Sequence, residues 1–291
     1  WKLHAAIIRF IDAFLGNPMP LSLILLIAAV QGVTEFLPVS SSGHLVLISV
    51  LTDQPYQGLS IDVAAHVGTL IAVLVYLRRD VISIITAMLG FGDSTQKASN
   101  RRLGLMIAAA TLPVVIVGFM VNYAAWHWLR LVTTLAWANL IFASLLWAAD
   151  RFGRDVFKLT DMRWSAALTI GLMQVCALIP GASRSGVTMT AARFFGYDRL
   201  AAARFSLLLS LPAIAGAGLL KTIGLIELGD MQLGLDAALV ASLSALFAWL
   251  AIRLMMSWLA RASFAIFAVY RLALGSVLLL ALQQGWIAAA I

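Results

Sequence analysis

The chain has 291 residues, of which 62% are hydrophobic and 11% charged, and its mean hydropathy is +0.97. This composition excludes an ordinary soluble domain and indicates a polytopic membrane protein. The formal net charge of +7 does not indicate a nucleic-acid partner, because the basic residues fall mainly in short loops, where they report topology and contact with anionic lipid. The single cysteine, Cys176, excludes an internal disulfide and a cysteine-based metal cluster.

The first polar interruption follows an N-terminal segment, 1–20, whose mixture of aromatic, aliphatic and charged residues predicts an interfacial helix. After the apolar residues 21–30, the stretch QGVTEFLPVSSSGH (31–44) brings Gln31, Glu35, three serines and His44 to membrane depth. Buried polar groups in lipid need a protein partner or a wet cavity, so this stretch is a candidate functional site. A second interpretation stays open, in which Glu35 or His44 is satisfied by packing or lies among lipid headgroups.

Local physical chemistry predicts the shape of this stretch. Pro38 lacks a backbone donor and breaks a helix, whereas Gly43 tolerates unusual dihedral angles. Ser40, Ser41 and Ser42 are N-cap candidates for a second short helix that begins near Gly43. The free amides and the dipole of such a helix would favour an anion, and a phosphate would suit it.

Three predicted spans follow the first break, at 61–77, 103–121 and 131–149. Asp62 and His66 lie near the start of the first span, where a role in the site and simple exposure or helix capping are both open. The loops 78–102 and 150–163 are rich in arginine and lysine, which places both on the cytoplasmic side by the positive-inside rule.

A second polar interruption, ALIPGASRSGVTMT, echoes the first. Gln31 precedes Pro38 by seven residues and Gln174 precedes Pro180 by six, and each proline leads into a turn rich in serine and glycine. Three spans again follow, at 203–220, 237–259 and 265–283. We therefore predict an all-α polytopic membrane protein with six transmembrane helices and two re-entrant broken-helix hairpins in an inverted repeat. The repeats, 21–149 and 150–291, would form a single integral membrane domain.

The distribution of basic residues along the chain supports this arrangement of spans and re-entrant hairpins. With both hairpins re-entrant, fourteen of the twenty basic residues fall inside and four outside, with Arg184 and Arg271 within the membrane. The loop that carries Glu227, Asp230 and Asp236 then lies outside. Threading the breaks as ordinary spans would destroy this segregation.

An inverted repeat brings its two broken helices together near the midplane of the membrane. Arg184 is the most informative residue there, because its guanidinium group suits two phosphate oxygens. A second interpretation has Arg184 reach the interface or pair with Glu35. The predicted site draws on both hairpins: Glu35, Ser40, Ser41, Ser42 and His44 from the first, and Ser183, Arg184, Ser185 and Thr188 from the second.

These residues resemble a known family, the bacterial undecaprenyl-diphosphate phosphatases, also called the bacitracin-resistance protein family. The resemblance rests on an (E/Q)xxxE element that leads into PVSSxGH, matched by Gln31 to His44, and on PGxSRSxxT, matched by Pro180 to Thr188. It covers nearly all of residues 21–285. It implies an integral membrane enzyme that removes the terminal phosphate of undecaprenyl diphosphate, which recycles the lipid carrier for peptidoglycan synthesis, with a divalent cation, Mg²⁺ or Ca²⁺, as cofactor.

Residue by residue, the resemblance makes Ser41 the nucleophile, His44 the active-site histidine, Glu35 the acidic residue and Arg184 the phosphate-binding arginine. Many members have glutamate where this chain has Gln31, so we expect metal binding to rest on Glu35, Gln31 and phosphate oxygens. Ser41 would attack phosphorus with His44 as general base, and direct attack by water stays open. The remaining predicted substrate-binding residues are Ser40, Ser42, Gly43, Gly181, Ser183, Ser185, Gly186 and Thr188.

The expected partners are undecaprenyl diphosphate and membrane lipid, without nucleic acid, and a homodimer is the assembly left open. We expect the bacterial cytoplasmic (inner) membrane, with the active site opening to the periplasmic side. The competing hypothesis is a lipid-phosphate transporter or flippase, because inverted repeats with broken helices at the midplane are typical of transporters. A transporter needs binding groups but no nucleophile, so release of phosphate by the purified protein separates the two hypotheses.

Overall fold

The computed structural model describes residues 19–41, 43–45, 59–124, 131–228 and 231–287. In this part of the chain the regular structure is helical, apart from one isolated bridge between Phe157 and Tyr197. The predicted interfacial helix at 1–20 lies almost wholly outside the described residues, as does Ser42. In chain order the elements are α2 (Leu21–Thr34), α4 (Leu59–Tyr76), α5 (Arg78–Met88), α6 (Ser94–Ala124), α7 (Val132–Phe152), η2 (Leu159–Asp161), α8 (Trp164–Met173), η3 (Gln174–Leu178), α9 (Arg184–Phe194), α10 (Arg199–Leu228), α11 (Met231–Leu259) and α12 (Ala265–Gln283).

The long helices confirm a polytopic all-α membrane protein. Within the described ranges, α6, α7, α10, α11 and α12 each contain a stretch long and apolar enough to cross a membrane. A sixth candidate is α4, which is followed by α5 after a bend of 82°. These six match the six predicted spans. The two predicted hairpins begin with the shorter apolar helices Leu21–Thr34 and Trp164–Leu178.

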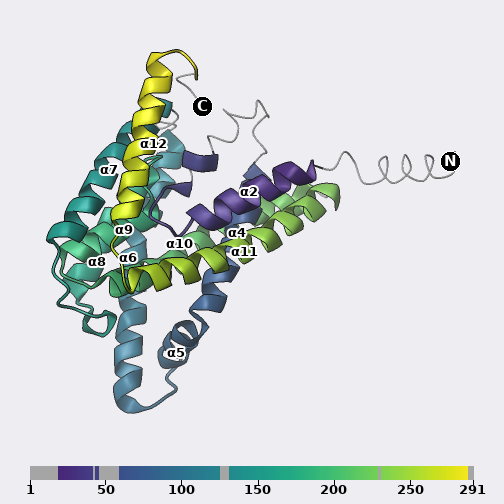
Figure 1. Ribbon diagram of the computed structural model, residues 1–291. Helices are drawn as coiled ribbons and strands as arrows, with labels where there is room; N and C mark the ends of the chain where they lie inside the picture. Colours follow the sequence, from purple (N-terminus) through teal and green to yellow (C-terminus); the bar gives the residue numbers. More distant parts are fainter. Residues whose placement is uncertain (1–18, 42, 46–58, 125–130, 229–230, 288–291) are drawn as a thin grey trace.

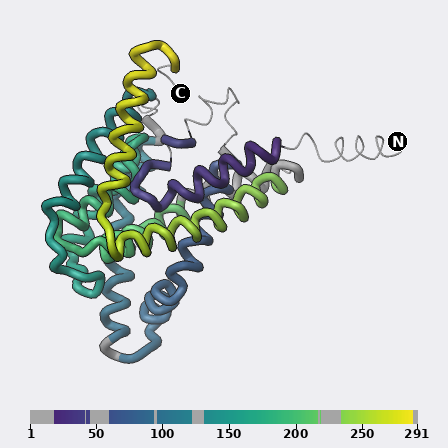
Figure 2. Tube along the Cα trace, viewed as in Figure 1, coloured from purple at the N-terminus to yellow at the C-terminus, as the bar shows by residue number. Residues whose placement is uncertain are grey.

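Helix packing depends on small residues that let backbones approach closely, as is common in membranes. In Figures 1 and 2, α2, α4 and α11 form one group and α7 pairs with α12. A Cβ added at Gly68 of α4 would lie 2.1 Å from the Ala241 carbonyl oxygen of α11, and one at Gly171 of α8 would lie 2.2 Å from that of Ala110 in α6. Neither position can hold a larger side chain without moving a helix.

The helix pairs also support the predicted internal repeat. α2 packs on α11, and α8, its counterpart in the second half, packs on α6. α4 likewise packs on α11 while α10 packs on α6, and α7 packs on α12. Each contact thus has a counterpart in the other half, as two related halves require. The division of the chain at residues 149 and 150 stays a prediction that these pairings support.

Large apolar side chains cover the outside of the helices. Leu112, Ile116 and Phe119 of α6 and Val277 of α12 are each more than half exposed. In water such surface would be a liability, but lipid tails cover it at no cost. The exposed apolar rows therefore mark the faces that meet the bilayer.

Asp150, at the end of α7, ties four segments together at one end of the molecule. Its carboxylate is 3.4 Å from the Nε atom of the fully buried Arg193 and accepts a hydrogen bond from Nε of Arg199 at 2.6 Å. The other oxygen accepts from the backbone amide of Phe264, just before α12, at 2.9 Å. α7, α9, α10 and α12 therefore share one buried carboxylate.

The loops predicted to lie inside gather at this same end. Asp80 at the start of α5 pairs with Arg204 of α10 at 2.7 Å, and the amide of Phe157 bonds to the Gly196 carbonyl at 3.0 Å. A contact between two segments predicted to lie outside also exists, because the Met19 amide donates to Asp236 at 3.0 Å. Segments assigned to one side by their charge therefore touch each other in space.

We predict that Asp150→Ala lowers the free energy of unfolding by about 1–3 kcal/mol, because it leaves the buried Nε of Arg193 and the Phe264 amide without their acceptor. The exposed Asp155 still pairs with Nη1 of Arg193 in this variant. Thermal unfolding in detergent measures the effect. Ser144→Ala, at an exposed position of the same helix, is the control and should change little. Equal melting temperatures for the two variants would contradict the central role of Asp150.

Candidate functional site

The first broken helix ends where its sequence turns polar. α2 stops at Thr34, and Glu35 follows as its C-cap with its amide bonded to the Gln31 carbonyl at 3.0 Å. Pro38 cannot continue the helix. Ser40 takes a positive φ of 73°, and the chain is helical again at Ser41.

The second broken helix repeats this geometry with different residues. α8 tightens into the 3₁₀ helix η3, and Pro180 ends it. Ser183 then takes a positive φ of 68°, and its Oγ caps the new helix by accepting from the Gly186 amide at 3.2 Å. Arg184 is the first residue of α9. Ser41 and Arg184 therefore hold equivalent positions, each directly after a serine whose backbone is strained.

Two polar contacts join the hairpins. Nη2 of Arg184 donates to Oε1 of Glu35 at 2.7 Å, and Oγ of Ser185 donates to the Leu37 carbonyl at 2.8 Å. The Arg184 guanidinium also lies 5.6 Å from the centre of the Phe36 ring, within range of a cation–π interaction. Arg184 does pair with Glu35, as the second interpretation of the sequence allowed. Its buried Nη1 has no hydrogen-bond partner among the described residues.

The carboxylate of Glu35 accepts most of the hydrogen bonds in this cluster. Its Oε2 accepts from Nε2 of Gln31 at 2.9 Å and from Oγ of Ser41 at 2.7 Å. Nε2 of His66, on α4, is 3.7 Å from the same oxygen. Because the carboxylate is buried and accepts from groups on three segments, it fixes the predicted nucleophile and the predicted phosphate clamp relative to each other.

His44 is held by both ring nitrogens. Nδ1 lies 2.7 Å from the Ser40 carbonyl oxygen, and Nε2 lies 2.5 Å from the hydroxyl of Tyr270 on α12. A carbonyl only accepts, so Nδ1 carries a proton, and Nε2 of the neutral ring accepts from the tyrosine. The two rings stack with centres 5.6 Å apart. In this arrangement Ser41 bonds to Glu35, and His44 bonds to Tyr270.

Arg271, next to Tyr270, binds the backbone of the turn between η3 and α9. Its side chain is fully buried, and its Nη2 donates to the carbonyls of Gly181 at 2.7 Å and Ala182 at 2.8 Å. Its Nε donates to Asn139 of α7 at 3.2 Å. The Gly186 amide is already used by Oγ of Ser183, so the amides of Arg184 and Ser185 are the candidates at the start of α9 for binding a ligand.

The predicted substrate-binding residues have several local roles. Gly181 has a φ of +91°, and a Cβ there would lie 2.3 Å from the Leu135 carbonyl oxygen, so a larger residue cannot replace it without strain. A Cβ at Gly186 would meet Nη1 of Arg271 at 2.8 Å, and one at Gly43 would lie 3.4 Å from Leu135.

The hydroxyl-bearing residues of this set also have protein contacts. Thr188 lies 2.7 Å from the hydroxyl of Ser206, and Ser183 lies 3.2 Å from that of Ser185. Ser40 is buried within the first turn. Their direct contact with substrate stays a prediction.

Three residues near the cluster were not assigned by sequence reasoning. Tyr270 and Arg271 stand together in the middle of an apolar span, which is a detectable signal, but nothing in the sequence shows which hairpin they face. His66 had two open interpretations, and the structure places it beside Glu35.

A divalent cation can be tested against the oxygens present. Among the described residues, no group of three histidine, cysteine or acidic side chains could hold a metal. Glu35 is the carboxylate of the cluster. Oε1 of Gln31, whose Nε2 bonds to Glu35, is buried and has no partner in the part of the chain that the structure describes. This donor set suits a hard cation that brings most of its ligands from phosphate and water, as Mg²⁺ commonly does.

The fold and the cluster define an integral membrane protein whose two broken helices meet around a serine, a carboxylate and an arginine. The chain belongs to the family described as bacitracin resistance protein BacA, whose model matches residues 24–277. Among curated relatives, the undecaprenyl-diphosphatase of Alcanivorax borkumensis is 46% identical over 261 residues, 88% of this chain and 96% of the relative. The undecaprenyl-diphosphatase of Alteromonas mediterranea is 43% identical over 261 residues, 90% of this chain and 98% of the relative.

Proposed function

We propose that this protein is an integral membrane phosphatase that hydrolyses undecaprenyl diphosphate to undecaprenyl phosphate and inorganic phosphate. The observation that carries the proposal is the convergence of Ser41 and Arg184, each the first helical residue after the break in its hairpin, on the two oxygens of Glu35. Family membership and the names of the relatives support the same activity. The reaction recycles the lipid carrier for peptidoglycan synthesis.

Binding begins with an exchange of partners at Arg184. The terminal phosphate of the substrate replaces Glu35 on the guanidinium group, and Nη1, which has no partner among the described residues, takes a second phosphate oxygen. The free amides at the start of α9 hold further oxygens. Catalysis of phosphoryl transfer chiefly needs this positioning and neutralisation of charge.

Release from Arg184 leaves Glu35 free to receive a proton. Because Ser41 already donates to Oε2 of Glu35, we propose that this carboxylate takes the Ser41 proton as Oγ attacks the terminal phosphorus. The bond to the bridging oxygen breaks and the lipid monophosphate leaves. Water then attacks the phosphoserine, and Nε2 of His44, after exchanging the Tyr270 hydroxyl for this water, takes its proton as base. Glu35 returns the proton that it holds to Oγ of Ser41 as the Ser41–phosphorus bond breaks, and inorganic phosphate leaves while His44 gives its proton to solvent.

The sequence-based prediction made His44 the general base for the attack of Ser41. The observed contacts favour two different bases, with Glu35 accepting the proton of Ser41 and His44 accepting the proton of the attacking water. Direct attack by water, with Ser41 only binding phosphate, is the competing mechanism.

A divalent cation, Mg²⁺ or Ca²⁺, would be held by Glu35 and by Oε1 of Gln31, together with phosphate oxygens. Bound there, it would neutralise charge on the diphosphate. Gln31 supplies no charge, so we propose that the cation binds together with the substrate.

The apolar prenyl chain of the substrate can stay in lipid while its diphosphate reaches the cluster between the hairpins.

The lipid-phosphate flippase hypothesis is less favoured, because a transporter needs no nucleophile and the relatives carry the name of a diphosphatase.

For the cellular location we propose the bacterial cytoplasmic (inner) membrane, with the active-site cleft opening toward the periplasm. The segregation of basic residues and the contacts among loops assigned to one side support that orientation.

We predict that Ser41→Ala and Arg184→Lys each lower kcat by roughly 100-fold or more, since one removes the nucleophile and the other replaces a planar fork by a point charge. Phosphate release from a long-chain prenyl diphosphate with added Mg²⁺ or Ca²⁺ measures this loss. Ser144→Ala and Arg253→Lys, at exposed positions on α7 and α11, are matched controls. Near-normal turnover of Arg184→Lys would refute the role of Arg184 in binding phosphate. If Ser41→Ala keeps its activity while Arg184→Lys loses it, direct attack by water is favoured.

Tyr270→Phe keeps the ring that stacks on His44 and removes the hydroxyl that donates to Nε2. We expect kcat to fall by about tenfold with KM nearly unchanged, because the imidazole loses one of the two contacts that orient it. The pH dependence of kcat should also change, which a purely structural role for the hydroxyl would not produce. Tyr76→Phe, at the far end of α4, is the control. Identical pH profiles for Tyr270→Phe and the wild type would exclude this positioning role.

The orientation can be tested by labelling single cysteines in a Cys176→Ala background. Ser99→Cys, at an exposed position of α6, should react with an impermeant reagent only from the cytoplasmic side. Gln284→Cys, at the exposed end of α12, should react only from the periplasmic side. The opposite pattern would reverse the proposed topology, and reaction of both from one side would refute the odd number of spans between them.

A further inference from the structure

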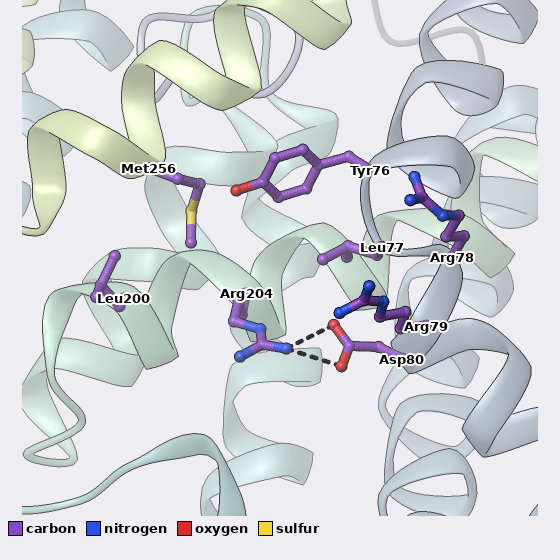
Figure 3. Close-up of a pocket in the computed structure, with 8 residues that line it drawn as sticks. All are labelled: Tyr76, Leu77, Arg78, Arg79, Asp80, Leu200, Arg204 and Met256. Atoms are coloured by element: carbon purple, nitrogen blue, oxygen red, sulfur yellow. Dashed lines mark hydrogen bonds and ion pairs between the residues drawn. The ribbon is translucent and has the colours of Figure 1, made fainter.

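A basic cavity lies between the α4–α5 junction and the helices α10 and α11, away from the Glu35 cluster (Figure 3). Its volume is about 460 Å³, and its charged lining residues are Arg78, Arg79, Asp80 and Arg204. Tyr76, which also lines it, lies ten residues beyond His66 on α4, or about 15 Å along the helix. The cavity is therefore separate from the site described above.

The charges in this cavity do not balance. Nη2 of Arg204 donates to both oxygens of Asp80, at 2.7 and 2.8 Å, so the carboxylate is used by one nitrogen of one arginine. Arg78 and Arg79 are exposed and add two further positive charges. Three guanidinium groups and a single carboxylate line the cavity, although Nη1 of Arg78 also donates to the Val75 carbonyl at 3.4 Å. The lining therefore has an excess of two positive charges, which suits a phosphate-bearing anion.

The other lining residues are the aromatic Tyr76 and three apolar residues, and all four lie at or near the end of a membrane span. Leu77 and Met256 are buried and Leu200 is half-buried. The α4 span ends at Tyr76, the α10 span begins at Arg199 and the α11 span ends at Leu259. The cavity thus sits where three apolar spans give way to polar chain, which is the level of lipid headgroups.

The helix that begins at this cavity has an exposed apolar row. α5 turns 82° from α4, and Ile82, Ile85 and Leu89, spaced to share a face, are 59%, 52% and 68% exposed. A helix with basic residues at its start and an exposed apolar face suits the boundary between headgroups and acyl chains. Lipid tails would cover this row while a headgroup enters the cavity.

We propose that this cavity binds the phosphate headgroup of an anionic phospholipid. Arg78, Arg79 and the remaining nitrogens of Arg204 bind the phosphate, and the apolar floor formed by Leu77 and Met256 contacts the glycerol and the start of the acyl chains. The proposal does not depend on the phosphatase activity. Its failure would leave the site at Glu35 unaffected.

Native mass spectrometry of the delipidated full-length protein, titrated with short-chain phosphatidylglycerol or phosphatidylcholine, tests the proposal. The wild type should bind phosphatidylglycerol at least about tenfold more tightly than phosphatidylcholine. Arg78→Gln/Arg79→Gln should weaken phosphatidylglycerol binding roughly 30-fold, which corresponds to about fivefold for each arginine. Arg151→Gln/Arg154→Gln, which removes two exposed charges at the same end of the molecule, should change it by less than about twofold.

Equal affinity for the two lipids overturns the proposal, as does wild-type binding by the Arg78/Arg79 variant or an equal loss in the control variant. Inorganic phosphate added as a competitor separates the two sources of the same chemistry. Displacement of the lipid by similar concentrations of phosphate would make the cavity a free-phosphate site. Melting temperatures without lipid establish that the variants are folded, and Met256→Trp, which fills the floor without changing charge, should also weaken binding.

Discussion

The ion pair between Glu35 and Arg184 is the interaction on which the polar centre depends. A carboxylate and a guanidinium group within a membrane are each costly alone, and pairing them allows both to be buried. Because one comes from each hairpin, the pair also joins the two halves. The other oxygen of Glu35 accepts from Ser41 and Gln31. Removing the Glu35 carboxylate would therefore leave the nucleophile without its partner and would remove one of the two polar contacts that join the hairpins.

This pair also explains how the buried charges are compensated when no substrate is bound. Arg184 is occupied by an internal anion until a phosphate competes for it. In the proposed mechanism, this exchange releases Glu35 when Ser41 has a phosphorus to attack. Binding and activation would thereby be coupled through one pair of side chains.

Much of this architecture could be predicted from the sequence because the physical causes are local. Proline and serine positions predict both breaks, apolar length predicts the spans, and basic loops predict which segments share a side. The contacts of Tyr270, Arg271 and His66 could not be predicted in this way. They depend on which face of α12 or α4 turns toward a hairpin, and that rotation is set by close packing at glycines such as Gly68, whose partners lie far away in the chain.

The origin of the centre from two halves has a mechanical consequence. The distance between Ser41 and Arg184 is set by how the halves seat against each other, and a misplacement of about 1 Å is enough to slow a reaction that depends on orientation. The small residues at the helix crossings and the Asp150 node resist such sliding. A bilayer thinner or thicker than the apolar belt strains those contacts. We therefore expect the turnover of this protein to depend on the thickness of the membrane around it.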